Sequence, residues 1–167
     1  MCSLLFDADG DGDNDLYVVS GGSSFQPHTP LYQDRLYLND GRGVFTLAAS
    51  ALPKMWNSGA AVVANDFDRD GDLDLFVGGR IVPGAYPMPA RSYLLQNESE
   101  NGTVVFKDVT SELLPQATEA GLVCAALWTD FDNDNWPDLI LAGEWMPITF
   151  YKNEEGRFED VTKQTGL

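Results

Sequence analysis

The sequence predicts an all-β fold built from three four-stranded antiparallel units, and three observations indicate it. A nine-residue motif rich in aspartate occurs at residues 7–15, 66–74 and 130–138. Short apolar runs of strand length, bounded by turn residues, lie on both sides of each motif. The motif starts are separated by 59 and 64 residues, which is the spacing of one repeated structural unit. We therefore expect three copies of one strand-rich unit, with little helix beyond short turns near residues 48–51 and 111–114.

Each acidic motif is expected to join the first two strands of its unit. In the second copy, residues 60–63 lead into the motif and residues 75–77 lead out of it. A third strand is expected over residues 92–97, and a short fourth strand ends near Phe106. Four strands per unit and a repeat of about 60 residues are typical of a β-propeller blade. The predicted blades span residues 1–53, 54–116 and 117–167.

The composition limits the class of protein further. The chain has 167 residues, a formal net charge of −16 and 44% hydrophobic residues, which suits one folded domain with an apolar core. The excess of acid disfavours nucleic acid as a partner, because phosphate binding needs clustered Lys and Arg. No apolar run reaches the roughly 20 residues of a membrane span, so membrane insertion is not expected. Two cysteines do not make a disulfide framework.

Most of the acid lies in the three repeated motifs. Fourteen of the 26 acidic side chains fall there, although two unit charges 4 Å apart repel by about 4 kcal/mol at an effective dielectric of 20. Such crowding requires a cation, and clustered oxygen ligands without His or Cys favour Ca²⁺. The sequence thus predicts three calcium sites between the first and second strands of the blades. Their residues are Asp7, Asp9, Asp11, Asp13 and Asp15; Asp66, Asp68, Asp70, Asp72 and Asp74; and Asp130, Asp132, Asp134, Trp136 and Asp138.

The other common calcium motif, the EF-hand, is excluded by the twelfth position. An EF-hand loop places a bidentate Glu there, whereas these motifs have Val18, Val77 and Leu141, and no helical pattern flanks them. The aspartate at position 9 replaces that Glu, and position 7, which is Trp136 in the third motif, is expected to offer its backbone carbonyl. The third motif departs from the others at Asn135–Pro137, so its full occupancy stays open.

Further features are shared with a known family. They are Asp-Phe-Asp-Arg-Asp-Gly-Asp-Leu-Asp-Leu at 66–75, an Asn…Gly…Phe ending, and Phe-x-Asp-Val-Thr at 106–110 and 158–162. On these residues the chain resembles FG-GAP/VCBS repeats, which build the integrin α-subunit propeller. It is most similar to bacterial VCBS-repeat and cartilage-acidic-protein-like (ASPIC/UnbV-type) chains. The resemblance implies an extracellular, calcium-loaded propeller that binds proteins or glycans.

Three blades are too few for a closed ring, because closed propellers typically have four to eight. We therefore expect either a part of a larger propeller, whose remaining blades lie in a longer chain, or a homo-oligomer that completes the ring.

The connections between the second and third strands are the candidate ligand-binding loops. They are long in the first two copies and carry aromatic and charged residues. Long ordered loops of this kind often bind ligands, but the same residues would also suit loops that cover the blade rim or plug a channel. The candidate residues are Phe25, His28, Tyr32, Arg80, Tyr86 and Trp145.

The function expected from these features is a calcium-binding module that mediates protein or glycan binding, or adhesion, without catalysis. The family resemblance places such a module outside the cell, at the cell surface or in the periplasm. Two alternatives stay open: a part of a polysaccharide-processing enzyme similar to certain lyases, and a structural spacer. Catalysis would need a paired acid and base at a cleft. The loop candidates His28, Arg80 and Glu144 have no clear partner in the sequence.

Overall fold

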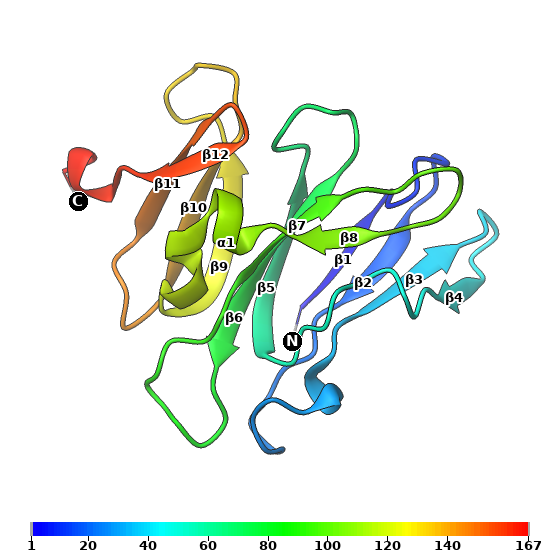
Figure 1. Ribbon diagram of the computed structural model, residues 1–167, viewed down its shortest axis with the longest axis horizontal. Helices are drawn as coiled ribbons and strands as arrows, with labels where there is room; N and C mark the ends of the chain where they lie inside the picture. The colour runs from blue at the N-terminus through cyan, green and yellow to red at the C-terminus, as the bar shows by residue number, and fades with distance from the viewer. Residues whose placement is uncertain (1, 167) are drawn as a thin grey trace.

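The computed structural model describes residues 2–166, which form three antiparallel sheets of four strands each (Figure 1). Within each sheet, every strand pairs with the next strand along the chain. The first sheet contains β1 (Ser3–Phe6), β2 (Asp15–Val18), β3 (Arg35–Asn39) and β4 (Phe45–Leu47). The second contains β5 (Ser58–Asn65), β6 (Asp74–Ile81), β7 (Tyr93–Asn97) and β8 (Phe106–Asp108). The third contains β9 (Leu122–Thr129), β10 (Asp138–Glu144), β11 (Thr149–Glu154) and β12 (Arg157–Asp160). The predicted fold class is confirmed.

Helical structure within residues 2–166 is confined to short segments. They are η1 (Pro30–Tyr32), α1 (Thr110–Leu113), η2 (Pro115–Glu119) and η3 (Thr162–Gln164). The helix α1 lies where one short helical turn was expected, whereas the other expected turn, near residues 48–51, forms no helix. None of these helices is long and apolar enough to cross a membrane. Met1 and Leu167, at the ends of the first and third predicted blades, lie outside the described residues, and the blade limits 1–53, 54–116 and 117–167 stay a prediction.

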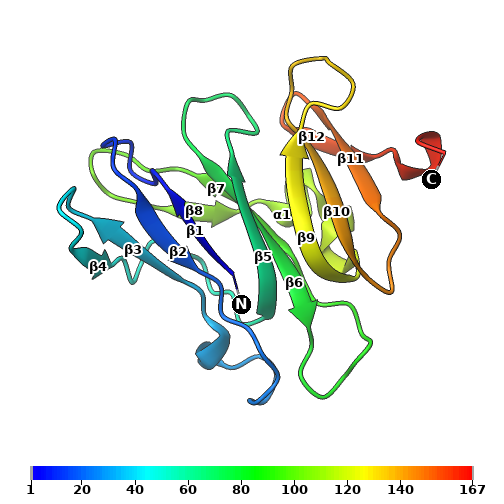
Figure 2. The ribbon, with the colours of Figure 1, turned by 180° about the vertical axis from the view of Figure 1, so that it is seen from behind.

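The three sheets are arranged as consecutive blades of a propeller, with the second sheet between the other two (Figures 1 and 2). The first strands β5 and β9 contact each other across the blade boundary, as do β1 and β5. All three acidic loops lie at one end of the molecule, at the top of Figure 1. The connections between second and third strands lie at the other end. The fold therefore gathers the two sets of candidate residues at opposite ends.

The hydrophobic core consists of two clusters, each sandwiched between neighbouring sheets. Leu75 and Val77 of β6 face the cluster shared with the first sheet, whereas Phe76 faces the cluster shared with the third. This alternation follows from the period of two residues along a strand. In the second cluster, Phe67 stacks on Trp128 with 6.5 Å between ring centroids, and both rings contact Phe158. Phe67 of the second blade thus packs against two aromatic side chains of the third sheet, Trp128 and Phe158.

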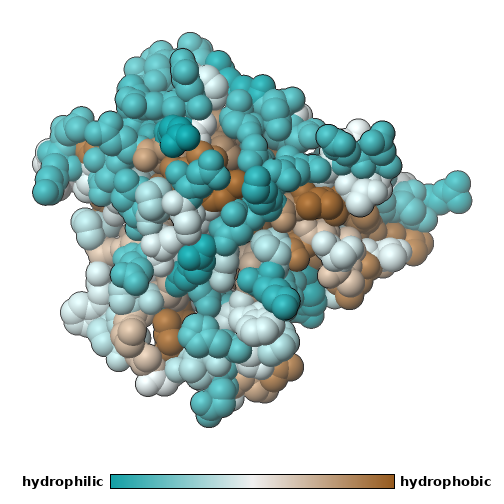
Figure 3. Space-filling view, viewed as in Figure 1, coloured by the Kyte–Doolittle hydropathy of each residue, from teal (hydrophilic) through white to brown (hydrophobic). Residues whose placement is uncertain are grey.

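The outward faces of the first and third sheets carry exposed apolar side chains. Leu5 on β1 is 58% exposed and Leu127 on β9 is 56% exposed. Hydrophobic atoms also lie over β3 and β4 at the right of Figure 3, where Val44, Phe45 and Leu47 are exposed. Among the described residues no further sheet packs on these two faces, whereas the second sheet is covered by a neighbouring sheet on each side.

A buried carboxyl group, Asp34, ends the connection between β2 and β3. It accepts hydrogen bonds from the Ser20 backbone N–H at 2.6 Å and from the Tyr17 hydroxyl at 2.9 Å. Burial raises the pKa of Asp34 from 3.8 to about 7, although the hydrogen bonds from Ser20 and Tyr17 oppose the rise. Folding therefore favours the protonated form of this side chain.

This shift predicts a pH dependence of stability. Between pH 4 and 7 the Asp34 carboxyl ionises in the unfolded chain but stays protonated in the folded one. Its contribution to the free energy of unfolding therefore falls as pH rises through this window, by on the order of 4 kcal/mol. Asp34→Asn cannot ionise, so urea unfolding at about pH 4.5 and pH 8 should show the variant gaining on the wild type at the higher pH. A difference that is the same at both pH values would contradict the prediction.

Candidate metal centres and the opposite loop face

The three acidic loops are organised by hydrogen bonds from their own backbone. In the second loop, Asp66 accepts from the Gly71 N–H at 3.1 Å, Asp68 from the Asp70 N–H at 3.3 Å, and Asp70 from the Asp72 N–H at 3.0 Å. The equivalent bonds occur in the first and third loops. The loop backbone therefore holds at least one oxygen of each of these carboxylates, and in Asp7 and Asp130 it holds both.

This folding brings carboxylates of each loop together. In every loop, three aspartates each place one oxygen so that the three oxygens lie within 4.8 Å of one another. The groups are Asp7, Asp9 and Asp15; Asp66, Asp68 and Asp70; and Asp130, Asp132 and Asp138. The remaining predicted ligands, Asp11, Asp13, Asp72, Asp74, Asp134 and Trp136, belong to the same loops but lie outside these groups.

The aspartate at position 9 fastens each loop to its sheet. Asp74 is fully buried, and its two oxygens accept from the backbone N–H groups of Phe67 at 3.1 Å and Asn97 at 2.8 Å. Asp15 and Asp138 make the same pair of bonds. Burial raises the pKa of Asp74 to about 8, and the nearby Asp68 and Asp70 contribute to the rise. A cation beside Asp74 would favour its ionised form.

The asparagine whose backbone N–H donates one of these bonds also joins neighbouring blades. The Asn97 side-chain amide donates to the Ala8 carbonyl, in the acidic loop of the first blade, at 3.1 Å. The Asn153 amide donates to the equivalent Phe67 carbonyl of the second blade at 2.8 Å. Sequence reasoning noted this asparagine as part of a repeat ending but missed its role. The available signal in the sequence was that an asparagine recurs at the end of the third strand in every copy, as Asn39, Asn97 and Asn153.

The first and second loops suit a hard cation. Asp13 Oδ1 and Asp66 Oδ1 are buried carboxylate oxygens without a hydrogen-bond partner among residues 2–166. Burial also raises the pKa of Asp9 and Asp13, and neighbouring aspartates add to both shifts. Neither loop contains His or Cys, so the donor set is the oxygen-only set that Ca²⁺ prefers. The residues present therefore fit calcium.

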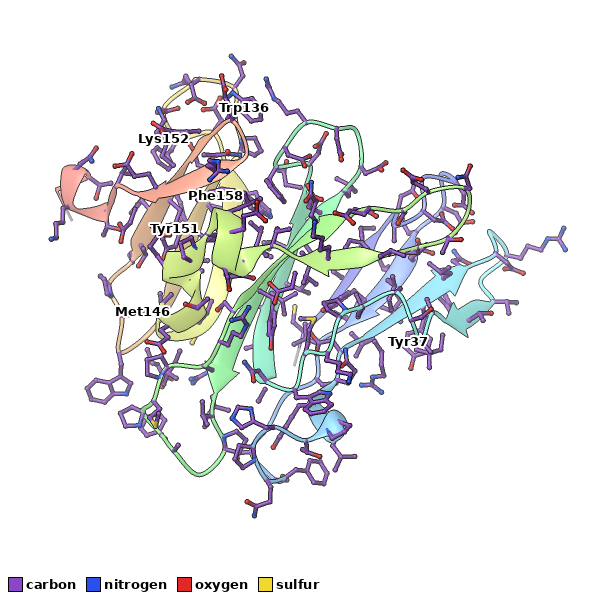
Figure 4. The ribbon with its side chains drawn as sticks, viewed as in Figure 1. Tyr37, Trp136, Met146, Tyr151, Lys152 and Phe158 are labelled. Atoms are coloured by element: carbon purple, nitrogen blue, oxygen red, sulfur yellow. The ribbon has the colours of Figure 1, made fainter. Side chains whose placement is uncertain are left out.

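The third loop has different neighbours (Figure 4). The Lys152 ammonium lies 2.5 Å from Asp132 Oδ2 and 3.2 Å from Asp134 Oδ2. This contact lowers the pKa of Asp132. From the second loop, Arg69 donates to the Asn135 carbonyl at 2.6 Å, and its guanidinium carbon lies 4.7 Å from the centroid of the Trp136 ring. Two basic side chains therefore contact this loop.

The candidate ligand loops at the opposite end form a partly aromatic surface. Trp145 is 74% exposed, and its indole N–H donates to the Tyr86 hydroxyl at 2.7 Å, which links the third blade to the second. Phe25 and His28 are exposed in the first blade. Tyr32 is buried instead, because its hydroxyl is hydrogen-bonded to the Phe25 backbone. Tyr32 thus supports the loop and does not line its surface.

The three loop residues considered for catalysis, His28, Arg80 and Glu144, do not form one cluster. Arg80 and Glu144 form an ion pair of 2.7 Å between blades. His28 lies in the exposed connection of the first blade, with its backbone φ at 57°. The described residues thus give Glu144 a structural partner in Arg80.

Three consecutive four-stranded sheets with an acidic loop after each first strand define a chain of propeller-type blades. Residues 7–77 match the FG-GAP-like repeat family. The chain is also similar to cartilage acidic protein 1 of Xenopus tropicalis (35% identical over 101 residues) and of Mus musculus (36% over 101 residues). Each match covers 59% of this chain but only 14% of the relative. The predicted resemblance is confirmed.

The bond between blades predicts the effect of replacing its asparagine. Asn153→Ala removes the donor to the buried Phe67 carbonyl and should lower the free energy of unfolding by about 2–3 kcal/mol, because a buried carbonyl without a partner is costly. Asn39→Ala is the matched control, since Asn39 bonds to Asn14 within its own blade at 3.1 Å and is partly exposed. The free energy of unfolding of Asn39→Ala should fall by only about 1 kcal/mol. Equal losses in urea unfolding would show that the contact between blades contributes nothing.

Proposed function

We propose that the chain is a calcium-stabilised binding module of an extracellular protein. The observation that carries the proposal is the repeated loop, which turns three carboxylates toward one point in each of three blades. Five aspartates within nine residues, as in the first and second loops, are unfavourable without a cation. A loop of this kind makes the stability of the fold depend on calcium. This dependence suits a protein outside the cell, where calcium is abundant.

The proposed calcium ligands are the aspartates at positions 1, 3, 5 and 9 and the carbonyl at position 7. Bound there, calcium would neutralise the crowded carboxylates of the loop. In the second loop the carboxylate ligands would be Asp66, Asp68, Asp70 and Asp74, and Asp66 Oδ1 would gain the partner it lacks among the described residues. Extracellular modules bind calcium at roughly 10⁻⁴–10⁻³ M, which suits a calcium-rich compartment outside the cell. The name cartilage acidic protein 1 supports this location, because it describes a relative from cartilage.

The proposed partner surface lies at the end opposite the acidic loops. It includes Phe25, Tyr86 and Trp145, which are more than half exposed. Aromatic anchors of this kind carry much of the energy of protein interfaces and also suit stacking on sugar rings. The partner is therefore a protein or a glycan, bound without catalysis. FG-GAP repeats and the matched relatives favour such a non-catalytic module over the polysaccharide-lyase alternative.

The outward faces of the first and third sheets are proposed to pack against further blades. Leu5 and Leu127 are exposed on these faces. The contacts of Ala8 with Asn97 and of Phe67 with Asn153 supply the pattern that a further blade would continue. The additional blades would come from a longer chain or from a second copy.

The calcium proposal is tested by thermal unfolding. With a Kd of about 10⁻⁴ M, about 1 mM CaCl₂ should add about 1.4 kcal/mol per occupied site relative to EGTA, because calcium binds the folded state. The melting temperature should therefore rise on adding calcium, whereas MgCl₂ at the same concentration should have a smaller effect. An unchanged melting temperature would refute calcium binding.

The ligand register is tested by a pair of neighbouring substitutions in the second loop. Asp70→Ala removes a carboxylate of the gathered group and should abolish one site in calorimetric titration with calcium. Asp72→Ala is the control, because position 7 is proposed to offer only its carbonyl. It should retain the stoichiometry of the wild type. Equal losses in the two variants would contradict the register.

The partner surface is tested by Trp145→Ala on a glycan array and on immobilised collagen and fibronectin. Any binding seen for the wild type in calcium should weaken about tenfold or more, as truncation of an aromatic anchor does. Glu159→Gln, on the outermost strand β12, is the control and should bind like the wild type. Binding that survives Trp145→Ala unchanged would place the partner elsewhere.

A further inference from the structure

The three acidic loops differ at one side chain that comes from the third strand of each sheet. This residue directly precedes the asparagine that bonds to the position-9 aspartate: Leu38 in the first blade, Gln96 in the second and Lys152 in the third. Leu38 packs against the hydrophobic core and offers no hydrogen-bond donor. Gln96 donates a neutral amide to Asp68 Oδ2 at 2.5 Å. Lys152 places an ammonium against Asp132 and Asp134.

The buried carboxylate oxygens that lack a hydrogen-bond partner also differ between the loops. Buried carboxylate oxygens without a partner occur in the first loop, at Asp13, and in the second, at Asp66. The third loop contributes none among the residues that the structure describes. Asp130, Asp132 and Asp134 are exposed, so the oxygens of the third loop reach solvent, and two of them also contact Lys152.

The charge of the third loop is also lower. It contains four aspartates where each of the other loops has five, because Trp136 occupies position 7. Arg69 adds a second positive group beside Asn135 and Trp136. The repulsion that calls for a cation is thus already reduced by side chains of the protein itself.

We propose that the Lys152 ammonium is the resident counter-ion of the third loop, and that the chain binds two calcium ions, in the first and second loops. This inference rests on the proposed calcium function and departs from the three sites that the motif predicts. A calcium ion entering the third loop would have to separate Lys152 from Asp132 and Asp134 and would then lie near a like charge. The third blade therefore keeps its loop folded without calcium.

The proposal is tested by counting ions. The purified chain is equilibrated with about 1 mM CaCl₂, and bound calcium is measured by equilibrium dialysis with elemental analysis. The wild type should hold two ions. Lys152→Gln gives the third loop the same neighbour as the second loop and should raise the count to three.

The reciprocal variant is the matched control. Gln96→Lys places a lysine at the same strand position beside the second loop and should lower the count to one. The double variant Gln96→Lys with Lys152→Gln should return the count to two. Circular dichroism checks that each variant is folded, so that a lost ion is not mistaken for a lost structure.

A second measurement does not depend on the ion count. In EGTA, Lys152→Gln should melt below the wild type, because the third loop loses its internal counter-ion. Added calcium should then raise its melting temperature by more than it raises that of the wild type. An unchanged melting temperature in EGTA would overturn the proposed role of Lys152.

The outcomes separate this proposal from the one it rests on. Three ions in the wild type, or two in Lys152→Gln, would overturn the lysine proposal and leave calcium binding intact. No ion in any variant would overturn the calcium function and the lysine proposal together.

Discussion

The structure depends on one repeated interaction, the buried aspartate at position 9 of each acidic loop. Its two oxygens accept hydrogen bonds from two backbone N–H groups. One belongs to the residue at position 2 of the same loop and the other to the asparagine that ends the third strand, as Phe67 and Asn97 do for Asp74. This aspartate therefore sets the path of the loop and its distance from the sheet. The same asparagine continues to the loop of the preceding blade. This asparagine consequently links the geometry of one loop to the packing of the neighbouring blade.

The sequence was sufficient for the elements that depend on local pattern. The apolar run at 60–63 marks the centre of β5 (Ser58–Asn65), and residues 92–97 closely match β7 (Tyr93–Asn97). Alternating burial along strands and glycine at turns are local properties, so one copy of the repeat reveals them and three copies reinforce them. The convergence of aspartates within each loop was accessible for the same reason, because a nine-residue loop brings its own residues together.

Features that depend on contacts between distant segments were not accessible. Lys152 meets Asp132 and Asp134 because β10 and β11 pair with Leu139 opposite Tyr151, and this register is not visible in a loop motif. The burial of Tyr32 likewise results from how its connection folds back on Phe25. The sequence identified the aromatic residues of the loops but could not separate those that support a loop from those that reach solvent.

The asparagine contact between blades also has a direction. The second and third blades each donate an asparagine amide to a carbonyl of the blade before, as Asn153 does to Phe67. Blades related in this way can only be added head to tail, with every neighbour rotated in the same sense. A contact that joined two copies through their first sheets, face to face, would set donor against donor, and neither Asn39 amide would gain an acceptor beyond Asn14 of its own blade. Assembly about a common axis is therefore compatible with this polar seam, whereas a self-complementary contact through one face is not.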